Sequence, residues 1–507
     1  MRLDIKTLPS DINILHNIIS DLAIKNKSLE QQIRLLKHNK YGKSSEKYKN
    51  LNQLELELED NQASISELLS LDLPEEDDTA NQEKKRPVRK KLPSHFPREE
   101  VRLDPDPKCP SCGNEDFRNI SDDISETLEY IPFSFKVTKH IRPRCACNNC
   151  DRIVQAYAPE KPISKGMLGA SFLAHILTQK YCYHLPFYRQ SQIYGREGLE
   201  LSTSTLASSA GKCSKLLKLL SKEIQKYIFS SSHIHGDDTP VKTLAPGTGK
   251  TKTARIWSYI KDSRAHGSDD PPAICYFYSP DRKAIRPEDH MKDFKGVFHA
   301  DAYSGYNNLY NDKYKKILEA ACWAHTRRKF YEITVASDNA VISVTALQII
   351  GRLYKIESRI NGLPPEERKK IRQEKSKILV SKFFEFIKSA LPKLSKKSAT
   401  AKAINYALNN REALERFLED GKIEIDNNIA ERAMRTIAVG RKNWLFAGSD
   451  AGGETAANIY TIIETAKANN LNPEKYLHQI LKVIQGYNSQ KIHELLPWNI
   501  NMDQENL

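Results

Sequence analysis

The stretch Ser232-His233-Ile234-His235-Gly236-Asp237 decides the fold, because it places an acidic side chain at the end of a run that fits a β-strand. The same pattern occurs at Gly296-Val297-Phe298-His299-Ala300-Asp301. Further strands fit residues 254–260, 273–278 and 316–322, with a polar helix near 284–293. These runs have the length and the apolar or aromatic content of strands. The sequence therefore predicts a sheet in which acidic residues follow the first and fourth strands.

The predicted elements follow the order strand, strand, strand, helix, strand, helix, strand. This order is typical of a ribonuclease-H-like fold, in which the first and fourth strands are neighbours in the sheet. Residues 333–418 then have a mostly helical pattern, with a break at Gly362-Leu363-Pro364-Pro365. We expect this stretch to be an all-helical insertion, placed before the last core helix.

A third acidic residue, Glu431, lies in the stretch Asp426-Asn427-Asn428-Ile429-Ala430-Glu431-Arg432. Two aspartates on strands and a glutamate on a late helix could hold two divalent cations about 3.5–4 Å apart, the geometry of metal-assisted phosphoryl transfer. Carboxylates suit this role because they bind hard cations through oxygen. Two alternatives stay open: Asp238 could replace Asp237, and Asp426, which resembles a helix N-cap, could replace Glu431.

Basic side chains gather around the third acidic residue and after the fifth strand. Those that could neutralise DNA phosphates are Arg327, Arg328, Arg432, Arg435, Arg441 and Lys442. Surface ion pairing is the alternative for Arg432, Arg435 and Arg441, and simple solvation of the helix is the alternative for Arg327 and Arg328. Trp444 could stack on an unpaired base, but we favour a core position for it. A role at the metal site is the alternative for His325.

The N-terminal third contains two segments of distinct character. Residues 1–50 carry a heptad pattern, with leucine at 15, 22, 29 and 36 and Ile12, Ile19, Asn26 and Ile33 at the other seam position. This pattern favours a parallel two-stranded coiled coil and hence a homodimer; an amphipathic helix packed on its own protein is the alternative. Residues 51–104 are acidic and then basic, which is typical of a charged linker.

Residues 105–160 contain two paired-cysteine knuckles, formed by Cys109, Cys112, Cys147 and Cys150. Four thiolates can hold a structural zinc ion in tetrahedral geometry. The run 129–141 between the knuckles fits a β-hairpin, as a zinc ribbon requires. Cys145 is a possible substitute ligand, and buried free thiols are the alternative.

Residues 161–228 have helical apolar spacing, and a short turn at Gly198 separates two predicted helices. They could form a helix-turn-helix DNA-binding module, with a purely structural helical module as the alternative. Residues 454–487 fit two further helices, separated by Asn472-Pro473.

Composition limits the class of protein. The chain has 507 residues and a formal charge of +14, which suits a polyanionic partner such as DNA. A chain of this length predicts about two to four domains. Because we find neither an apolar run of about 18 residues nor a signal-peptide pattern, we expect a cytoplasmic, nucleoid-associated protein without a membrane partner.

These motifs together resemble the large transposase of the insertion-sequence family numbered 66, over nearly the whole chain. The resemblance rests on the zipper and residues 41–47, the cysteine knuckles, and the stretches 184–190, 237–241, 301–306, 322–330, 426–433 and 440–446. It implies a DDE-type enzyme that cuts at the terminal inverted repeats of its element and joins the 3′ ends to target DNA. Asp238 departs from the family pattern, where a glutamate is usual, and so do Ser208 and Ser209 in the helical module.

The resemblance implies that Asp237, Asp301 and Glu431 form the catalytic triad. Asp237 is chosen over Asp238 because the family's usual Asp-Glu-Thr places the ligand first. The resemblance also implies two magnesium ions, or manganese, and small accessory proteins encoded by the same element as partners. Two other functions compete: a ribonuclease-H-like nuclease that never joins strands, and a zinc-containing DNA-binding repressor.

The expected fold class is a multidomain α+β protein with a ribonuclease-H-like α/β core. Its expected segments are a coiled coil (1–50), a linker (51–104), a zinc ribbon (105–160), a helical DNA-binding module (161–228), the first part of the core (229–332), the helical insertion (333–418), the last core helix with its basic segment (419–453) and a helical tail (454–507).

Overall fold

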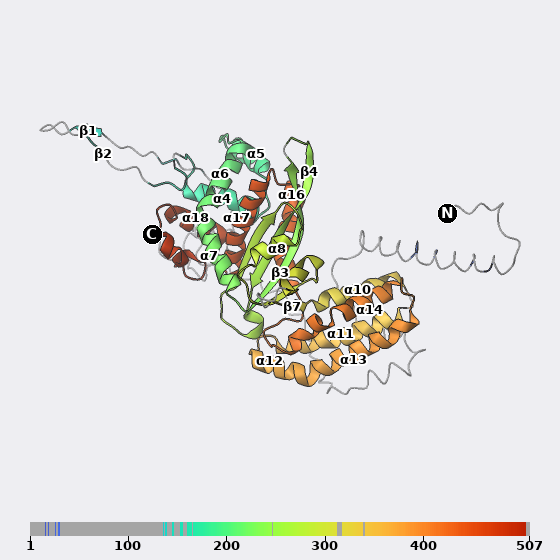
Figure 1. Cartoon of the computed structure of the whole chain (residues 1–507). Coiled ribbons are helices and arrows are strands. Elements are labelled where there is room, and N and C mark those ends of the chain that lie inside the picture. Colours follow the sequence, from blue (N-terminus) through green and yellow to red (C-terminus); the bar gives the residue numbers. More distant parts are fainter. Residues whose placement is uncertain are drawn as a thin grey trace, which may run out of the picture. The chain divides into compact units, whose positions relative to one another are not determined.

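The computed structural model describes residues 160–502, apart from 165, 246, 312–316 and 338–339, together with two short strands and a few isolated residues before them (Figure 1). The chain divides into two compact units, one of Leu54–Ala158 and one of Met1–Gln53 with Pro159–Leu507. In the first unit, β1 (Arg144–Ala146) pairs antiparallel with β2 (Ile153–Gln155). The four predicted zinc ligands, the charged linker and almost all of the predicted coiled coil and hairpin lie outside the described residues.

A mixed five-stranded sheet forms the centre of the larger unit. Its order is β5 (Ala273–Ser279), β4 (Lys250–Lys261), β3 (His233–Ala245), β6 (Gly296–Ala300) and β7 (Ile317–Ala321). The strands β3, β4 and β5 are antiparallel, whereas β6 and β7 run parallel to β3. The first and fourth strands of the sheet are therefore neighbours, as the sequence predicts.

The predicted end of the first strand is wrong. β3 does not stop at Asp237 but continues to Ala245, and this second half pairs with β4 and, at Thr243, with the single residue Ala447. Pro240 is tolerated in this half because the strand has no neighbouring strand on its other side there, so the missing N–H breaks no ladder. The Pro240 carbonyl instead accepts a hydrogen bond from Arg441 (2.7 Å).

Helices cover the sheet and share its hydrophobic core. α16 (Asn428–Trp444) packs against β3 and β4, and α17 (Asp450–Ala468) packs against β5. α4 (Ala170–Tyr181), α7 (Lys218–Phe229) and α18 (Pro473–Val483) complete this layer. The shorter elements around it are η3 (Arg264–His266), α8 (Ile285–His290), η4 (Ser304–Tyr306), α9 (Asn307–Asn311) and η8 (Ser489–Leu495).

Two packed helices, α5 (Phe187–Arg196) and α6 (Thr203–Leu216), flank the predicted turn. Gly198 lies in the turn with a φ of +80°, a conformation that glycine adopts without strain. Ser202 begins α6 as an N-cap, because its hydroxyl accepts a hydrogen bond from the Thr205 N–H (3.1 Å).

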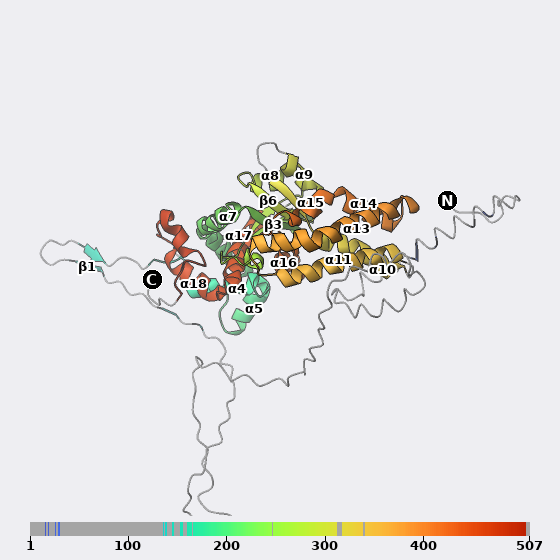
Figure 2. The same ribbon diagram turned by 90° about the horizontal axis from the view of Figure 1, so that it is seen from below.

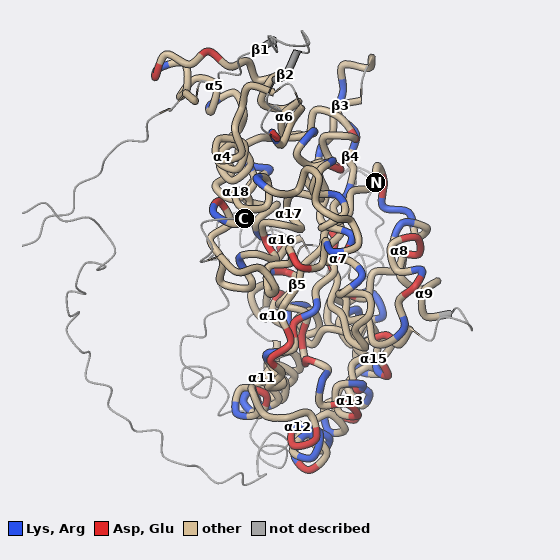
Figure 3. The backbone as a smooth tube through the Cα atoms, turned by 90° about the vertical axis from the view of Figure 1, so that its left-hand side faces the viewer, with Lys and Arg blue, Asp and Glu red and all other residues tan. Residues whose placement is uncertain are grey.

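The insertion is helical, as predicted (Figure 2), and its helices share a hydrophobic core with residues of β6 and β7. Its elements are α10 (Trp323–Ala336), α11 (Val341–Ile360), α12 (Pro365–Ile371), the π-helix η5 (Arg372–Ser376), α13 (Lys377–Ala390), η6 (Leu391–Lys393), α14 (Ala399–Asn409), α15 (Arg411–Glu415) and η7 (Arg416–Leu418). α12 has acidic residues in its first turn and basic residues in its last turn (Figure 3). In the described part of the chain, no helix is both long and apolar enough to span a membrane.

A buried ion pair connects the insertion to the segment that precedes α16. The Arg372 guanidinium donates to both carboxylate oxygens of Glu357 (2.8 and 2.6 Å) and to the carbonyls of Phe417 and Asp420 (2.9 and 3.2 Å). Arg372 and Glu357 are both buried. One guanidinium therefore ties α11 to the chain that leads into the last core helix.

Replacing Arg372 with methionine should destabilise the insertion by about 3–5 kcal/mol, because the buried Glu357 carboxylate would keep only its longer ion pair with Arg368 (3.5 Å) and two backbone carbonyls would lose their donor. Hydrogen exchange of the α11 and α13 amides measures this change. Arg359→Met, at an exposed position of α11, should cost less than about 0.5 kcal/mol. Equal protection in the two variants would contradict the role given to Arg372.

Candidate functional site

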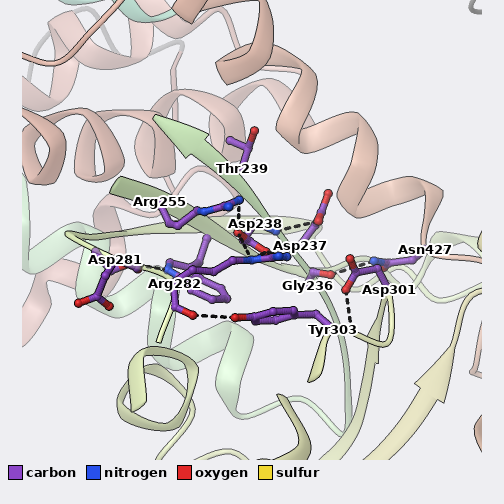
Figure 4. A network of polar contacts seen from close by, with 12 residues as sticks. Gly236, Asp237, Asp238, Thr239, Arg255, Asp281, Arg282, Asp301, Tyr303 and Asn427 are labelled. Carbon is purple, nitrogen blue, oxygen red and sulfur yellow. Dashed lines mark hydrogen bonds and ion pairs between the residues drawn. The ribbon is translucent and has the colours of Figure 1, made fainter. Parts of the chain in front are cut away.

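Asp237 lies on β3, at the point where the parallel neighbour β6 ends (Figure 4). One of its carboxylate oxygens accepts a hydrogen bond from the Asp238 N–H (2.8 Å). The pKa of Asp237 is raised from 3.8 to about 7, mainly by burial and in part by the nearby carboxylates of Asp301, Asp238 and Glu431, which together outweigh that hydrogen bond. Three acidic groups on different elements thus act electrostatically on this one side chain.

Asp301 follows β6 directly. The paired residues His235 and His299 lie two positions before Asp237 and Asp301, so the two aspartates occupy equivalent positions on adjacent parallel strands (Figure 4). The Asp301 carboxylate accepts a hydrogen bond from the Tyr303 N–H (3.1 Å). Ala302 between them has a φ of +59°, which turns the chain sharply away from the sheet.

Glu431 lies in the first turn of α16. Its oxygens lie 3.4 Å from Arg328 Nη2 and 3.7 Å from His325 Nε2, both on α10. Oxygen Oε1 is buried and has no hydrogen-bond partner among the described residues. Burial lowers the pKa of His325, although the neighbouring Glu431 opposes this shift.

The three acidic residues supply only oxygen donors, and Glu431 Oε1 lacks a hydrogen-bond partner. This donor set fits a hard divalent cation such as magnesium. Within the described residues, however, no three His, Cys, Asp or Glu side chains are close enough to form a ready-made metal cluster. The residues that would hold a metal are thus brought to one region without forming a closed coordination shell.

Asp238, the rival of Asp237, is engaged elsewhere. Its side chain is 1% exposed and forms ion pairs with Arg255 (2.9 Å) and Arg282 (2.6 Å). The Arg282 guanidinium also lies 3.6 Å from the ring centroid of Tyr303, whose hydroxyl donates to the Arg282 carbonyl (2.7 Å). Asp238 therefore anchors the Asp301 turn to β3, and the geometry favours Asp237 as the open carboxylate.

Asp426, the rival of Glu431, lies before the first turn of α16. Its carboxylate accepts hydrogen bonds from the N–H (3.1 Å) and the side-chain amide (2.7 Å) of Asn428. These contacts satisfy donors at the helix start, the role of a capping residue. The formal N-cap residue is its neighbour Asn427.

Sequence reasoning missed the function of Asn427, which is fully buried. Its side-chain amide donates to the Gly236 carbonyl (2.8 Å), and its amide oxygen lies 2.9 Å from His235 Nδ1. Its backbone N–H donates to Cys322 Sγ (3.1 Å). Asn427 thereby fixes the start of α16 against β3 and the end of β7; an Asn-Asn pair before a helix carries no signal for such distant partners.

The six predicted phosphate-binding residues fall into two groups. Arg432, Arg435 and Lys442 are exposed on α16. The other three have protein contacts: Arg328 pairs with Glu431, Arg327 is half-buried, and Arg441 donates to Thr239 Oγ1 (2.9 Å) and to the Pro240 carbonyl. Arg441 therefore holds α16 against β3, and simple surface ion pairing does not describe its role.

Trp444 is half-buried at the end of α16 and packs against the edge of the core, so the predicted core position is only partly correct. The Lys180 ammonium lies 5.6 Å from the Trp444 ring centroid and 4.7 Å from that of Phe187. Burial lowers the pKa of Lys180 to about 8. This cation links α4, α5 and α16 through aromatic faces.

Comparison with known proteins adds an independent finding. Residues 165–455 match the model of the "Transposase IS66 family". Residues 28–101, 106–151 and 461–498 match models described as "Transposase C of IS166 homeodomain", "zinc-finger binding domain of transposase IS66" and "IS66 C-terminal element".

Similar proteins of Sinorhizobium fredii cover most of the chain. The uncharacterized protein y4hP is 37% identical over 497 residues, which span 93% of this chain and 88% of y4hP. The uncharacterized protein y4qI is 37% identical over 94% of this chain and 89% of its own length. A third, y4jD, is 34% identical over 82% of each chain.

Asn427→Ala should destabilise the chain by about 2–3 kcal/mol, because it leaves the Gly236 carbonyl and the His235 ring buried without their partner. Thermal unfolding measures the loss. Asn443→Ala is the matched control on the same helix, because the Asn443 amide makes only one long hydrogen bond, to the Val439 carbonyl (3.4 Å). A loss no larger than that of the control would refute the positioning role of Asn427.

The raised pKa of Asp237 predicts a pH-dependent stability. Between its ordinary value of 3.8 and about 7, the folded chain retains a proton that the unfolded chain releases, so stability from this group falls as pH rises through that window. Asp237→Asn should remove this fall, and magnesium should stabilise wild type more at about pH 8 than at pH 5. Thermal unfolding across this pH range measures both effects, and Asp289→Asn, at an exposed position, is the control. Identical dependence of stability on pH in wild type and both variants would contradict the prediction.

Proposed function

The chain belongs to the IS66 transposase family, and we propose that it cuts DNA at the terminal inverted repeats of its element and joins the 3′ ends to target DNA. The observation that carries this proposal is that two further acidic side chains, from different elements, act on Asp237. Asp301 reaches it from the adjacent parallel strand and Glu431 from the first turn of α16, and both raise its pKa. Such a cluster of carboxylates suits phosphoryl transfer assisted by two metal ions.

The sheet supports assigning the core to the ribonuclease-H-like class. Three antiparallel strands are followed by two strands parallel to the first, in the order β5-β4-β3-β6-β7. This arrangement brings the first and fourth strands together, as that class requires. The assignment accounts for the position of both aspartates without any further assumption.

Asp237, Asp301 and Glu431 are the residues that would hold magnesium or manganese. When bound, two such ions would activate a water or 3′-hydroxyl and stabilise the leaving oxygen. The chain's own residues orient these ligands. Asn427 fixes β3 relative to α16, and Arg328, which is half-exposed beside Glu431, is free to exchange the carboxylate for a DNA phosphate.

The exposed cations on α16 extend this site along the DNA. Arg432, Arg435 and Lys442 lie on the helix that carries Glu431 and face solvent. They would contact the phosphate backbone, which positions the duplex without reading its sequence. We assign recognition of the element ends to the pair α5 and α6, whose helix-turn-helix arrangement suits a groove of DNA.

The remaining parts of the proposal concern the N-terminal region and the cell. Cys109, Cys112, Cys147 and Cys150 lie within the zinc-finger match and would hold a structural zinc ion. The heptads of residues 1–50 would join two copies in a homodimer. We also propose small element-encoded accessory proteins as partners and a cytoplasmic, nucleoid-associated location.

A cleavage-and-joining assay tests the function. Labelled DNA that carries the element's own ends is incubated with magnesium and wild-type protein or Glu431→Gln. We expect nicking and joining by wild type and a loss of at least about 10²-fold in the variant, because the glutamine lacks the charge needed to hold the metal. The control is Arg359→Met, a substitution on α11 outside the candidate site, which should retain activity.

The products distinguish the competing functions. Cleavage without any joined product would identify a nuclease. Binding of the ends without chemistry in either protein, even with the accessory proteins added, would support a repressor. Equal activity of wild type and Glu431→Gln would refute the assignment of Glu431.

A further inference from the structure

The end of α16 contains a strained residue. Leu445 has a φ of +60° and a ψ of −48°, and the Phe446 N–H donates to the Trp444 carbonyl (2.7 Å) across it. This is a γ-turn of the rare type with positive central φ. A bulky side chain avoids this conformation, because its Cβ approaches the backbone too closely. Strain of this kind persists only where the surrounding structure fixes the backbone, and such positions cluster at functional sites.

Contacts on both sides of Leu445 fix that backbone. On the far side, the Ala447 N–H donates to the Lys242 carbonyl (2.8 Å) and the Leu244 N–H donates to the Ala447 carbonyl (2.9 Å), which ties the chain to β3. On the near side, the Trp444 ring lies against Lys180. The turn is therefore held between the helical module and the sheet.

The strained turn displays two apolar side chains to solvent, Leu445 (65% exposed) and Phe446 (43% exposed). We call them the apolar pair. The flanking groups are basic: Lys442 is exposed one turn earlier on α16, and Lys242 is exposed on β3 beside Ala447. The nearest following acid, Asp450, is already paired with Lys252 (2.7 Å). An exposed apolar pair between cations complements DNA, which offers base faces between phosphates.

We propose that the apolar pair inserts into the base stack of the element-end DNA and holds an unstacked base. Leucine and phenylalanine are residues that proteins use as wedges between base steps. This inference rests on the proposed function and deepens it, because it names the part of the substrate that this turn recognises. Strain in the turn keeps the two side chains projected toward the DNA and prevents them from folding back onto the core.

The helix sets where the unstacked base would lie. Leu445 is 14 residues after Glu431, which corresponds to about 21 Å along α16. A base pair occupies about 3.4 Å of duplex, so, with α16 lying along the duplex as proposed above, the distorted step is expected about six base pairs from the cleaved phosphate. The exposed residues Arg435 and Lys442 lie between these two points on the helix.

Fluorescence of 2-aminopurine tests the inference without requiring cleavage. Element-end duplexes carry the probe at single positions, about three to nine base pairs from the cleaved end, and bind full-length protein in the Glu431→Gln background. Unstacking brightens the probe, and we expect a maximum near six pairs. Phe446→Ala and Leu445→Gly should reduce that signal about tenfold at saturating protein, as expected for the loss of a base-stacking contact.

Two controls separate recognition from folding. Leu445→Gly should leave the melting temperature unchanged or raise it, because glycine adopts a positive φ without strain. Ile378→Ala removes an exposed apolar side chain from α13 and should leave the fluorescence unchanged. A signal retained in both apolar-pair variants would overturn the inference.

Other outcomes also decide the question. If the variants lose self-association in sedimentation while the fluorescence stays unchanged, the apolar pair belongs to an interface between copies and the inference is wrong. If wild type cleaves and joins DNA with no bright position, the proposed function stands and the inference fails. If the probe brightens in the Glu431→Gln background but the protein with an intact triad cleaves no element-end DNA, the inference stands and the proposed function fails.

Discussion

The contacts of the buried Asn427 side chain hold the candidate site together. One amide group joins the Gly236 carbonyl and the His235 ring on β3, while the backbone N–H of the same residue joins Cys322 at the end of β7. Glu431 lies one helical turn later, so its position relative to Asp237 depends on this junction. A buried amide that lost these partners would be costly, and the junction therefore has a single stable arrangement.

The insertion supports the junction from the other side. It folds around a second hydrophobic core, distinct from the main one and reaching only the edge of the sheet at β6 and β7, which explains how so many residues can lie between the sheet and α16 without disturbing either. The indole N–H of Trp323 donates to the Leu414 carbonyl (2.9 Å), and its backbone N–H donates to the Ile425 carbonyl (3.1 Å). These bonds and the Arg372 contacts fix both ends of the chain that enters α16. Stability of the insertion is thus linked to the geometry of the site.

Much of this architecture could be predicted from local patterns, because strand runs, capping residues and the proline and glycine breaks act over a few residues. The predicted bounds of β6 agree with the structure. The rest depends on distant partners. Asp237 and Asp238 cannot be distinguished by periodicity alone, since the difference lies in Arg255 and Arg282 on other segments. The extension of β3 beyond Asp237 could not be predicted, because a strand accepts proline only where one of its sides lacks a neighbouring strand.

The central claim is that Asp237, Asp301 and Glu431 hold a pair of divalent metal ions. The most direct measurement is anomalous scattering from manganese in crystals of the protein bound to element-end DNA. Our account predicts two peaks about 3.5–4 Å apart, with oxygens of all three side chains as ligands. A single manganese peak that contacts only one of these side chains, or peaks elsewhere in the molecule, would contradict it.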